Sequence, residues 1–253
     1  MRCPLVEICC GDIESVVAAR QGGADRIELC SALAAGGLTP SAGMIETAVT
    51  VGVPEVNVLI RPREGDFLYS DAETQVMLRD IRQSAEAGAN GVVIGALNAD
   101  GTIATGTCRR LIEMARDHGL SVTFHRAFDQ CSNPLRSLEE IIDLGCDRLL
   151  TSGQASSALI GAELIGSLQR HAGSRIIIMA GAGITPDNAA EVIRATGVSE
   201  IHASAKTTTE SQMAFRISKV TMGRDDVDDY SRQVTSADTV ARLASIIHNI
   251  SKA

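Results

Sequence analysis

The sequence predicts an α/β fold, a closed (β/α)8 barrel of the TIM type, and three observations carry this prediction. The chain has 253 residues, close to the roughly 250 residues typical of such a barrel. Short apolar segments alternate with longer helical patterns along its whole length, which favours parallel strands covered by helices. No glycine-rich dinucleotide fingerprint follows the first apolar segment, and this counts against an open doubly wound sheet. We therefore expect a single domain spanning residues 1–253.

Eight apolar segments are the predicted strands, and several are apolar almost throughout, as strands covered by helices should be. They are Leu5–Cys9, Arg26–Cys30, Glu55–Ile60, Gly91–Ile94, Ser121–His125, Arg148–Thr151, Arg175–Ala180 and Glu200–Ala203. Amphipathic segments between and after the strands predict helices. These segments include Ser15–Gln21, Thr74–Ala87, Thr107–His118, Leu135–Leu144, Ala189–Ala195 and Ala237–Ile250.

Residues at the segment boundaries agree with this alternation. Ser70 and Glu73 have the spacing of a capping box. A side chain able to cap a helix precedes proline, a good first helical residue, at three places: Thr39-Pro40, Asn133-Pro134 and Thr185-Pro186. A glycine followed by a short link recurs before three strands and predicts left-handed helix ends: Gly23, Gly88 and Gly145. Two connections, Ser31–Pro40 and Ser204–Ser236, are long, and loops of this length are usually functional or mobile.

Composition excludes several classes of function. Asp and Glu number 31 against 23 Lys and Arg, a net charge of −8, whereas a nucleic-acid binder needs a surface that neutralises phosphates. No uninterrupted apolar stretch approaches the roughly 18 residues that span a bilayer, and the first residues do not resemble a signal peptide. We expect a cytoplasmic protein that binds neither nucleic acid nor membrane. Its seven cysteines are an odd number, so free thiols are expected rather than a disulfide framework.

Two neighbouring predicted strands end in the same Glu-x-Cys pattern, Glu7 with Cys9 and Glu28 with Cys30. Side chains alternate along a strand, so each pair shares one face. If these faces point inward, both pairs reach the barrel mouth, where such barrels place their chemistry. Two thiolates are soft ligands that favour Cu(I), whereas a lone free cysteine is more often a small buried hydrophobe. We interpret the other cysteines as packing or surface residues: Cys3, Cys10, Cys108, Cys131 and Cys146.

Arginine and histidine residues follow two further strands. Arg61 and Arg63 are candidates to hold a carboxylate or phosphate through their planar guanidinium groups. The alternative is that they pair with nearby acids, Glu7, Glu28 or Asp66, as a scaffold. His125 is a candidate general acid or base, since histidine titrates near neutrality; the alternative is a hydrogen-bonded structural histidine.

The loops after the last two strands carry a candidate anion site. A turn containing Gly181 and Gly183 precedes a predicted helix start, and backbone N–H groups at such a turn bind anions. Barrels often bind phosphate at these two loops. Lys206 and His202 are candidate supports for this site, and the alternative is that the turn is only a tight connection.

The sequence resembles the CutC family, the copper homeostasis proteins, over nearly the whole chain. The segments that carry the resemblance are residues 7–9, 22–30, 36–41, 60–63, 65–67, 69–71, 123–129 and 150–153. The resemblance implies a (β/α)8 barrel, a cytoplasmic location, self-association into a homo-oligomer, and a link to copper tolerance and Cu(I) binding. The thiols proposed as copper ligands in the family correspond to Cys9 and Cys30.

Two hypotheses of function follow. The first is a copper homeostasis protein that binds Cu(I) through Cys9 and Cys30 at the barrel mouth. The second is a barrel enzyme that acts on a small anionic metabolite, phosphorylated or carboxylated. In the second, Glu7 or Glu28 with His125 would supply acid–base catalysis, and Arg61 and Arg63 would hold the anion.

Overall fold

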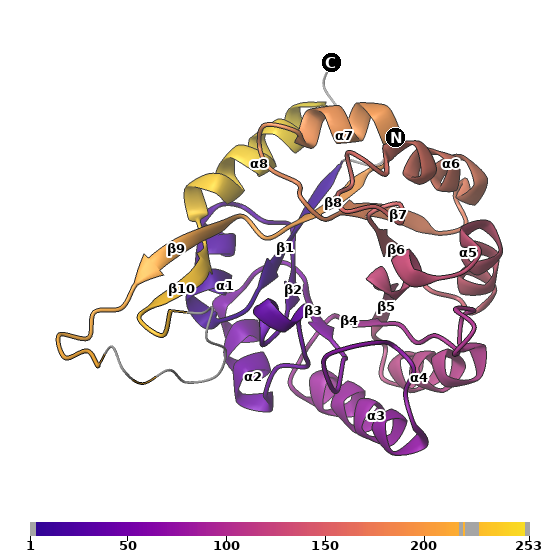
Figure 1. Cartoon of the computed structure of the whole chain (residues 1–253), viewed down its shortest axis with the longest axis horizontal. Helices are drawn as coiled ribbons and strands as arrows, with labels where there is room; N and C mark the ends of the chain where they lie inside the picture. Colours follow the sequence, from indigo (N-terminus) through magenta and orange to yellow (C-terminus); the bar gives the residue numbers. More distant parts are fainter. Residues whose placement is uncertain (1–3, 218–219, 221–227, 251–253) are drawn as a thin grey trace.

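The computed structural model of the chain describes residues 4–217, 220 and 228–250. Eight parallel strands form a closed barrel in the order of the sequence (Figure 1). They are β1 (Leu5–Cys10), β2 (Arg26–Leu29), β3 (Val56–Leu59), β4 (Gly91–Ile94), β5 (Ser121–Phe124), β6 (Arg148–Thr151), β7 (Ile177–Gly181) and β8 (Glu200–Ala203). The predicted (β/α)8 barrel is confirmed, and each predicted strand lies within two residues of an observed one.

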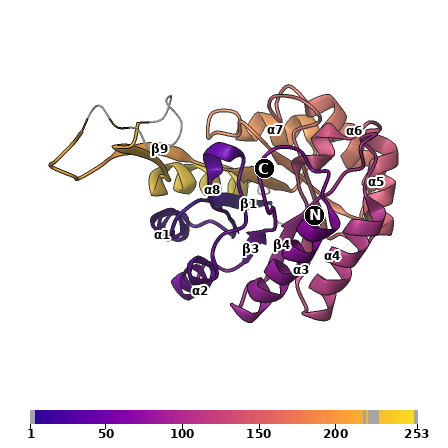
Figure 2. The same cartoon turned by 60° about the horizontal axis from the view of Figure 1, so that its bottom comes forward.

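The α-helices lie around the outside of the barrel, as the two views in Figures 1 and 2 show. They are α1 (Ile13–Gln21), α2 (Ala42–Val51), α3 (Asp71–Glu86), α4 (Thr105–Asp117), α5 (Pro134–Asp143), α6 (Ala162–Ala172), α7 (Ala189–Thr196) and α8 (Ala237–Ile250). Two short 3-10 helices, η1 (Leu33–Ala35) and η2 (Arg126–Gln130), lie in loops. Among the described helices, none has both the length and the apolarity needed to cross a membrane.

Most of the predicted helix boundaries are confirmed. Ser70 and Glu73 form the capping box of α3, and Asn133 caps α5. The glycine that precedes β2, β4 and β6 has a positive φ in each case, which an L side chain rarely adopts.

Two predicted helix starts are wrong. Ser41 rather than Thr39 caps α2, because Thr39 pairs with the chain after β3: its hydroxyl accepts a hydrogen bond from the Arg61 N–H at 2.9 Å. Thr185 lies in a turn closed by Asn188, whose Oδ1 accepts a hydrogen bond from the Thr185 N–H at 2.9 Å. Helix α7 therefore begins only at Ala189.

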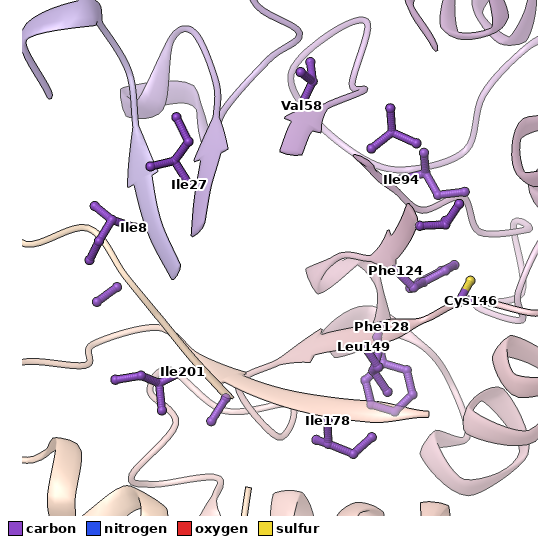
Figure 3. Packing of buried hydrophobic residues seen from close by; sticks show 14 of the residues in the cluster. Ile8, Ile27, Val58, Ile94, Phe124, Phe128, Cys146, Leu149, Ile178 and Ile201 are labelled. Carbon is purple, nitrogen blue, oxygen red and sulfur yellow. The ribbon is translucent and has the colours of Figure 1, made fainter. Parts of the chain in front are cut away.

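The main hydrophobic core lies between the barrel and its helices. Alternate residues of every strand contribute to it, and Figure 3 shows several of them around the ring of strands: Ile8, Ile27, Val58, Ile94, Phe124, Leu149, Ile178 and Ile201. The intervening residues face the barrel interior, where a much smaller apolar cluster joins Cys9, Cys30, Leu59 and Val93. The remaining interior residues are largely polar.

The connection Ser204–Ser236 contains a second, separate sheet. Strands β9 (Lys206–Glu210) and β10 (Ser231–Thr235) pair antiparallel. They form an arm that projects away from the barrel in both views (Figures 1 and 2). The sequence predicted only a long loop here, because β9 is polar and exposed throughout and so has no buried face that would reveal a strand.

Candidate functional site

A cavity of about 860 Å³ opens at the carboxyl ends of the barrel strands. Its lining includes six residues from or just after five strands: Cys9, Glu28, Cys30, Arg61, His125 and His202. These residues lie on the inward faces of their strands, as the alternation of Glu and Cys predicted. The ring of parallel strands thus brings side chains from distant parts of the sequence to one rim.

The two thiols of the Glu-x-Cys strand ends lie next to each other. The Sγ atoms of Cys9 and Cys30 are 3.7 Å apart, since β1 and β2 are neighbours and Cys9 pairs with Glu28 in register. Gly37 lies over Cys30: a Cβ at this position would come within 3.6 Å of the Cys30 Sγ and 2.8 Å of Leu59. Both cysteines are therefore held in a closely packed part of the cavity wall.

Acidic groups complete two overlapping sets of potential metal ligands. The ligand atoms of Cys9, Glu28 and Cys30 all lie within 4.8 Å of one another, and so do those of Glu7, Glu28 and His202. Glu28 belongs to both sets. The described residues thus offer two thiols, two carboxylates and one imidazole within a small volume.

The hydrogen bond between the two thiols separates their acidities. Together with interactions with His202, it lowers the pKa of Cys9 to about 5 against the opposing effect of burial. The same hydrogen bond raises the pKa of Cys30 well above its ordinary value, because Cys30 keeps the proton that it donates to the Cys9 thiolate. One thiolate and one thiol are the expected state of the pair at neutral pH.

His202 lies between the two carboxylates of the Glu-x-Cys strand ends. Its Nδ1 is 2.8 Å from Glu7 Oε1 and its Nε2 is 3.5 Å from Glu28 Oε2. Burial would lower the pKa of His202, but hydrogen bonds with Cys9 and Glu7 and the charge of Glu28 raise it well above its ordinary value. The sequence singled out His125 as the partner of these acids, whereas the structure places His202 there.

A buried ion-pair network lies next to this site, deeper in the barrel interior. Arg26 is 1% exposed and pairs with both Glu7 and Glu200, and Arg148 reaches Glu200 at 3.1 Å. Burial would raise the pKa of Glu7, but Arg26 and His202 lower it to about 2. This network was not predicted from the sequence. The sequence does contain a sign of it, because Arg26 and Glu28 are two residues apart and so share one face of an otherwise apolar strand.

Of the two arginines after β3, only Arg61 lines the cavity. Arg63 lies outside its lining and pairs with Asp66 at 2.9 Å and with Glu73 at 2.5 Å. Its guanidinium also lies over the Tyr69 ring, 5.2 Å from the centroid. The structure thus gives Arg63 the scaffold arrangement that was the alternative for it.

His125 lines another part of the cavity, away from the carboxylates. Its Nδ1 accepts a hydrogen bond from the Ala127 N–H at 3.1 Å, which caps η2. Burial and the positive charge of Arg61 lower the pKa of His125 to about 3. A neutral imidazole is therefore present at this position at physiological pH.

The loops after β7 and β8 contribute part of the candidate anion site. Gly183 and Lys206 line the cavity, whereas Gly181 ends β7 and is absent from the lining. Lys206 is exposed at the start of the β9–β10 arm. Cysteines outside the thiol pair are buried in packing positions: Cys10, Cys108, Cys131 and Cys146. Cys3 lies outside the described residues.

Comparison with known proteins agrees with the sequence resemblance. The sequence model of the CutC family matches residues 4–207. A family protein CutC of Vibrio cholerae serotype O1 is 52% identical over 250 residues, covering 96% of this chain and 98% of the relative. One from Vibrio vulnificus is 49% identical over 246 residues, covering 97% of this chain and 98% of the relative.

A solved structure gives the same result. The chain is similar to a CutC copper homeostasis protein from Streptococcus agalactiae with a TM-score of 0.75 and 32% identity, over 79% of this chain and 98% of the other. A thiamine phosphate pyrophosphorylase from Pyrococcus furiosus, 18% identical with a TM-score of 0.59, shares the barrel fold alone. The family profile, the relatives and the barrel with its paired Glu-x-Cys strand ends agree, and the chain belongs to the CutC family.

Proposed function

We propose that this protein binds Cu(I) at the barrel mouth as part of copper homeostasis, with Cys9 and Cys30 as the ligands. The observation that carries the proposal is the 3.7 Å separation of their Sγ atoms on neighbouring strands. The description of the Streptococcus agalactiae relative as a copper homeostasis protein supports it. As the family resemblance implies, the protein would act in the cytoplasm as a homo-oligomer.

The chemistry of the donor set fits copper better than zinc. Soft thiolate ligands select Cu(I), Zn²⁺ or iron–sulfur clusters, but structural zinc sites use four Cys or His ligands. The described residues around the thiol pair supply two sulfur atoms and one adjacent carboxylate, Glu28. His202 and Glu7 would then orient and charge-balance the site rather than complete a tetrahedral shell. The lowered pKa of Cys9 supplies one ligand already in the thiolate form that metals bind.

Titration with Cu(I) against a competing Cu(I) chelator tests the proposal. We expect the parent protein to take one copper ion per chain from the chelator, and the Cys9→Ser, Cys30→Ser double variant to take none. Cys10→Ala is the matched control, because Cys10 is the adjacent buried cysteine outside the thiol pair. The proposal fails if the double variant takes Cu(I) from the chelator as well as the parent and the Cys10→Ala control do.

A second candidate function is that of an enzyme acting on a small anionic metabolite. The size of the cavity favours it, since about 860 Å³ falls within the roughly 300–1,000 Å³ of small-molecule sites. In this case Glu28 and His202 form the acid–base pair, and Gly183 and Lys206 provide anion contacts at the rim. A thermal-shift screen of phosphorylated and carboxylated metabolites tests it, because bound ligand raises stability by mass action.

A further inference from the structure

The cavity wall contains a buried positive charge with no carboxylate partner among the described residues. Arg61 is 6% exposed. Its Nη1 donates to the carbonyls of Ala35 and Gly37, each at 2.9 Å, and its Nη2 to the carbonyl of Gly65 at 2.7 Å. Its Nε has no hydrogen-bond partner in the described chain. An uncompensated buried guanidinium is costly, so a negatively charged group in the cavity would stabilise it.

The aromatic neighbours of Arg61 do not neutralise this charge. The positive charge of Arg61 acts on Tyr69, but burial raises the pKa of Tyr69 to about 12. Tyr69 is thus uncharged at neutral pH. Phe67 contributes the face of its ring, 5.2 Å from the Arg61 Cζ. The three carbonyl contacts hold the guanidinium in one position between two loops, so little further ordering is needed for it to receive a ligand.

A second unpaired donor lies on the same wall. His125 is 5% exposed, and its Nδ1 accepts the Ala127 N–H. The proton of the neutral ring is therefore on Nε2. This Nε2–H has no hydrogen-bond partner among the described residues, although burying an unsatisfied donor costs about 1–3 kcal/mol.

The position of this ring is fixed by its surroundings. The centroid of His125 lies 5.0 Å from that of Phe67, the same ring that contacts Arg61. On another side the ring lies against Gly95, where a Cβ would come within 2.5 Å of the imidazole. Only glycine fits at this position, so the backbone directly after β4 makes room for His125.

We propose that Arg61 and His125 bind the carboxylate group of a small metabolite in the cavity. Both residues line it, both contact Phe67, and each carries a buried N–H group without a partner among the described residues. One guanidinium and one neutral imidazole match the single charge and two oxygens of a carboxylate. A phosphate dianion carries more charge and more oxygens than these donors satisfy. This site uses neither of the two thiols, so it is a binding site additional to the copper site.

Calorimetric titration with small carboxylates tests the proposal, with acetate, glycolate, malonate, succinate and inorganic phosphate as the probes. The main variant is His125→Asn. Its side-chain oxygen can still accept the Ala127 N–H and cap η2, but no N–H reaches the position of Nε2. Arg61→Lys keeps the charge and removes the planar guanidinium. Arg175→Gln is the control, because Arg175 is a half-exposed arginine that precedes β7 and lies outside the cavity lining.

We expect at least one carboxylate to bind the parent protein, and binding to weaken roughly 10- to 100-fold in His125→Asn, as for the loss of a hydrogen bond to a charged group. Arg175→Gln should bind as the parent does. If Arg61→Lys does not fold, the proposal is judged on His125→Asn alone. Circular dichroism checks that His125→Asn is folded. The proposal is overturned if no carboxylate binds, if phosphate binds more tightly than every carboxylate, or if the cavity variants bind as the parent does.

The same proteins separate this proposal from the copper proposal. The Cys9→Ser, Cys30→Ser double variant should keep its carboxylate affinity, and His125→Asn should keep its copper affinity. Loss of carboxylate binding in the double variant would place the ligand at the thiols and overturn the assignment to Arg61 and His125. If neither the parent protein nor any variant binds copper, the copper proposal fails, and the carboxylate proposal is still decided by the calorimetric titrations.

Discussion

Acidification should destabilise the protein through one buried histidine. Burial and the charge of Arg61 lower the pKa of His125 from 6.5 to about 3. In the unfolded chain the same residue takes up a proton near pH 6.5, so the unfolded state binds more protons below this pH. The stability contributed by the neutral ring is therefore fully present above about pH 6.5 and decreases as the pH falls toward about 3.

The expected size follows from the two pKa values. One proton of difference changes the free energy of unfolding by about 1.4 kcal/mol per pH unit. Between about pH 7.5 and about pH 4.5, His125 alone should lower the free energy of unfolding by roughly 3 kcal/mol. This is a large fraction of the stability of an ordinary domain, which is about 5–15 kcal/mol.

Urea unfolding of the parent and of His125→Asn at a series of pH values measures this contribution. Asparagine does not titrate and still accepts the Ala127 N–H, so the other titrating groups act nearly equally in both proteins. The variant should be less stable than the parent at neutral pH, and the gap should narrow by roughly 3 kcal/mol at the acidic end. A gap that stays constant across the series would refute the assignment of a neutral, buried His125.

Three further outcomes are expected. Arg26→Met should lower the free energy of unfolding by about 3–5 kcal/mol, because it removes the buried guanidinium that Glu7 and Glu200 share; a change under 1 kcal/mol in urea unfolding would contradict this. His202→Gln should weaken Cu(I) binding roughly 10- to 100-fold in the chelator competition, since in the proposed copper site His202 orients and charge-balances the thiols; unchanged affinity would exclude that role. Phe215→Asp should shift the proposed homo-oligomer toward monomer in light scattering, because Phe215 is 72% exposed on the loop that follows β9; the control Ile160→Asp changes a residue that is 71% exposed elsewhere and should leave the mass unchanged.

The number, order and approximate bounds of the barrel elements could be predicted from the sequence. Apolar runs such as Val92-Val93-Ile94 identify strands, and Ser70 with Glu73 identifies the start of α3, because these signals depend on residues close together in the chain. The start predicted from Thr39 failed because its hydroxyl bonds the Arg61 N–H after β3. The start predicted from Thr185 failed because its backbone N–H donates to Asn188 in a turn that precedes α7. The β9–β10 arm was missed because it has no buried face to produce an alternating apolar pattern.

The sequence by itself determined which side chains gather at the barrel mouth. In a barrel of parallel strands, the alternation of side chains and the common direction of the strands send Cys9, Glu28 and Cys30 to one rim. These consequences depend on the local period of each strand and on closure of the sheet, and both can be read from the order of the residues.

Only the tertiary structure decided how those side chains pair. His202 rather than His125 lies beside Glu7 and Glu28, because closure of the barrel makes β8 the neighbour of β1 although nearly 200 residues separate them. Arg61 turns into the cavity while Arg63, two residues later, leaves the strand and meets Asp66 outside it. Distances of a few ångströms between such residues set charge and acidity, and they depend on the packing of the whole chain rather than on any local pattern.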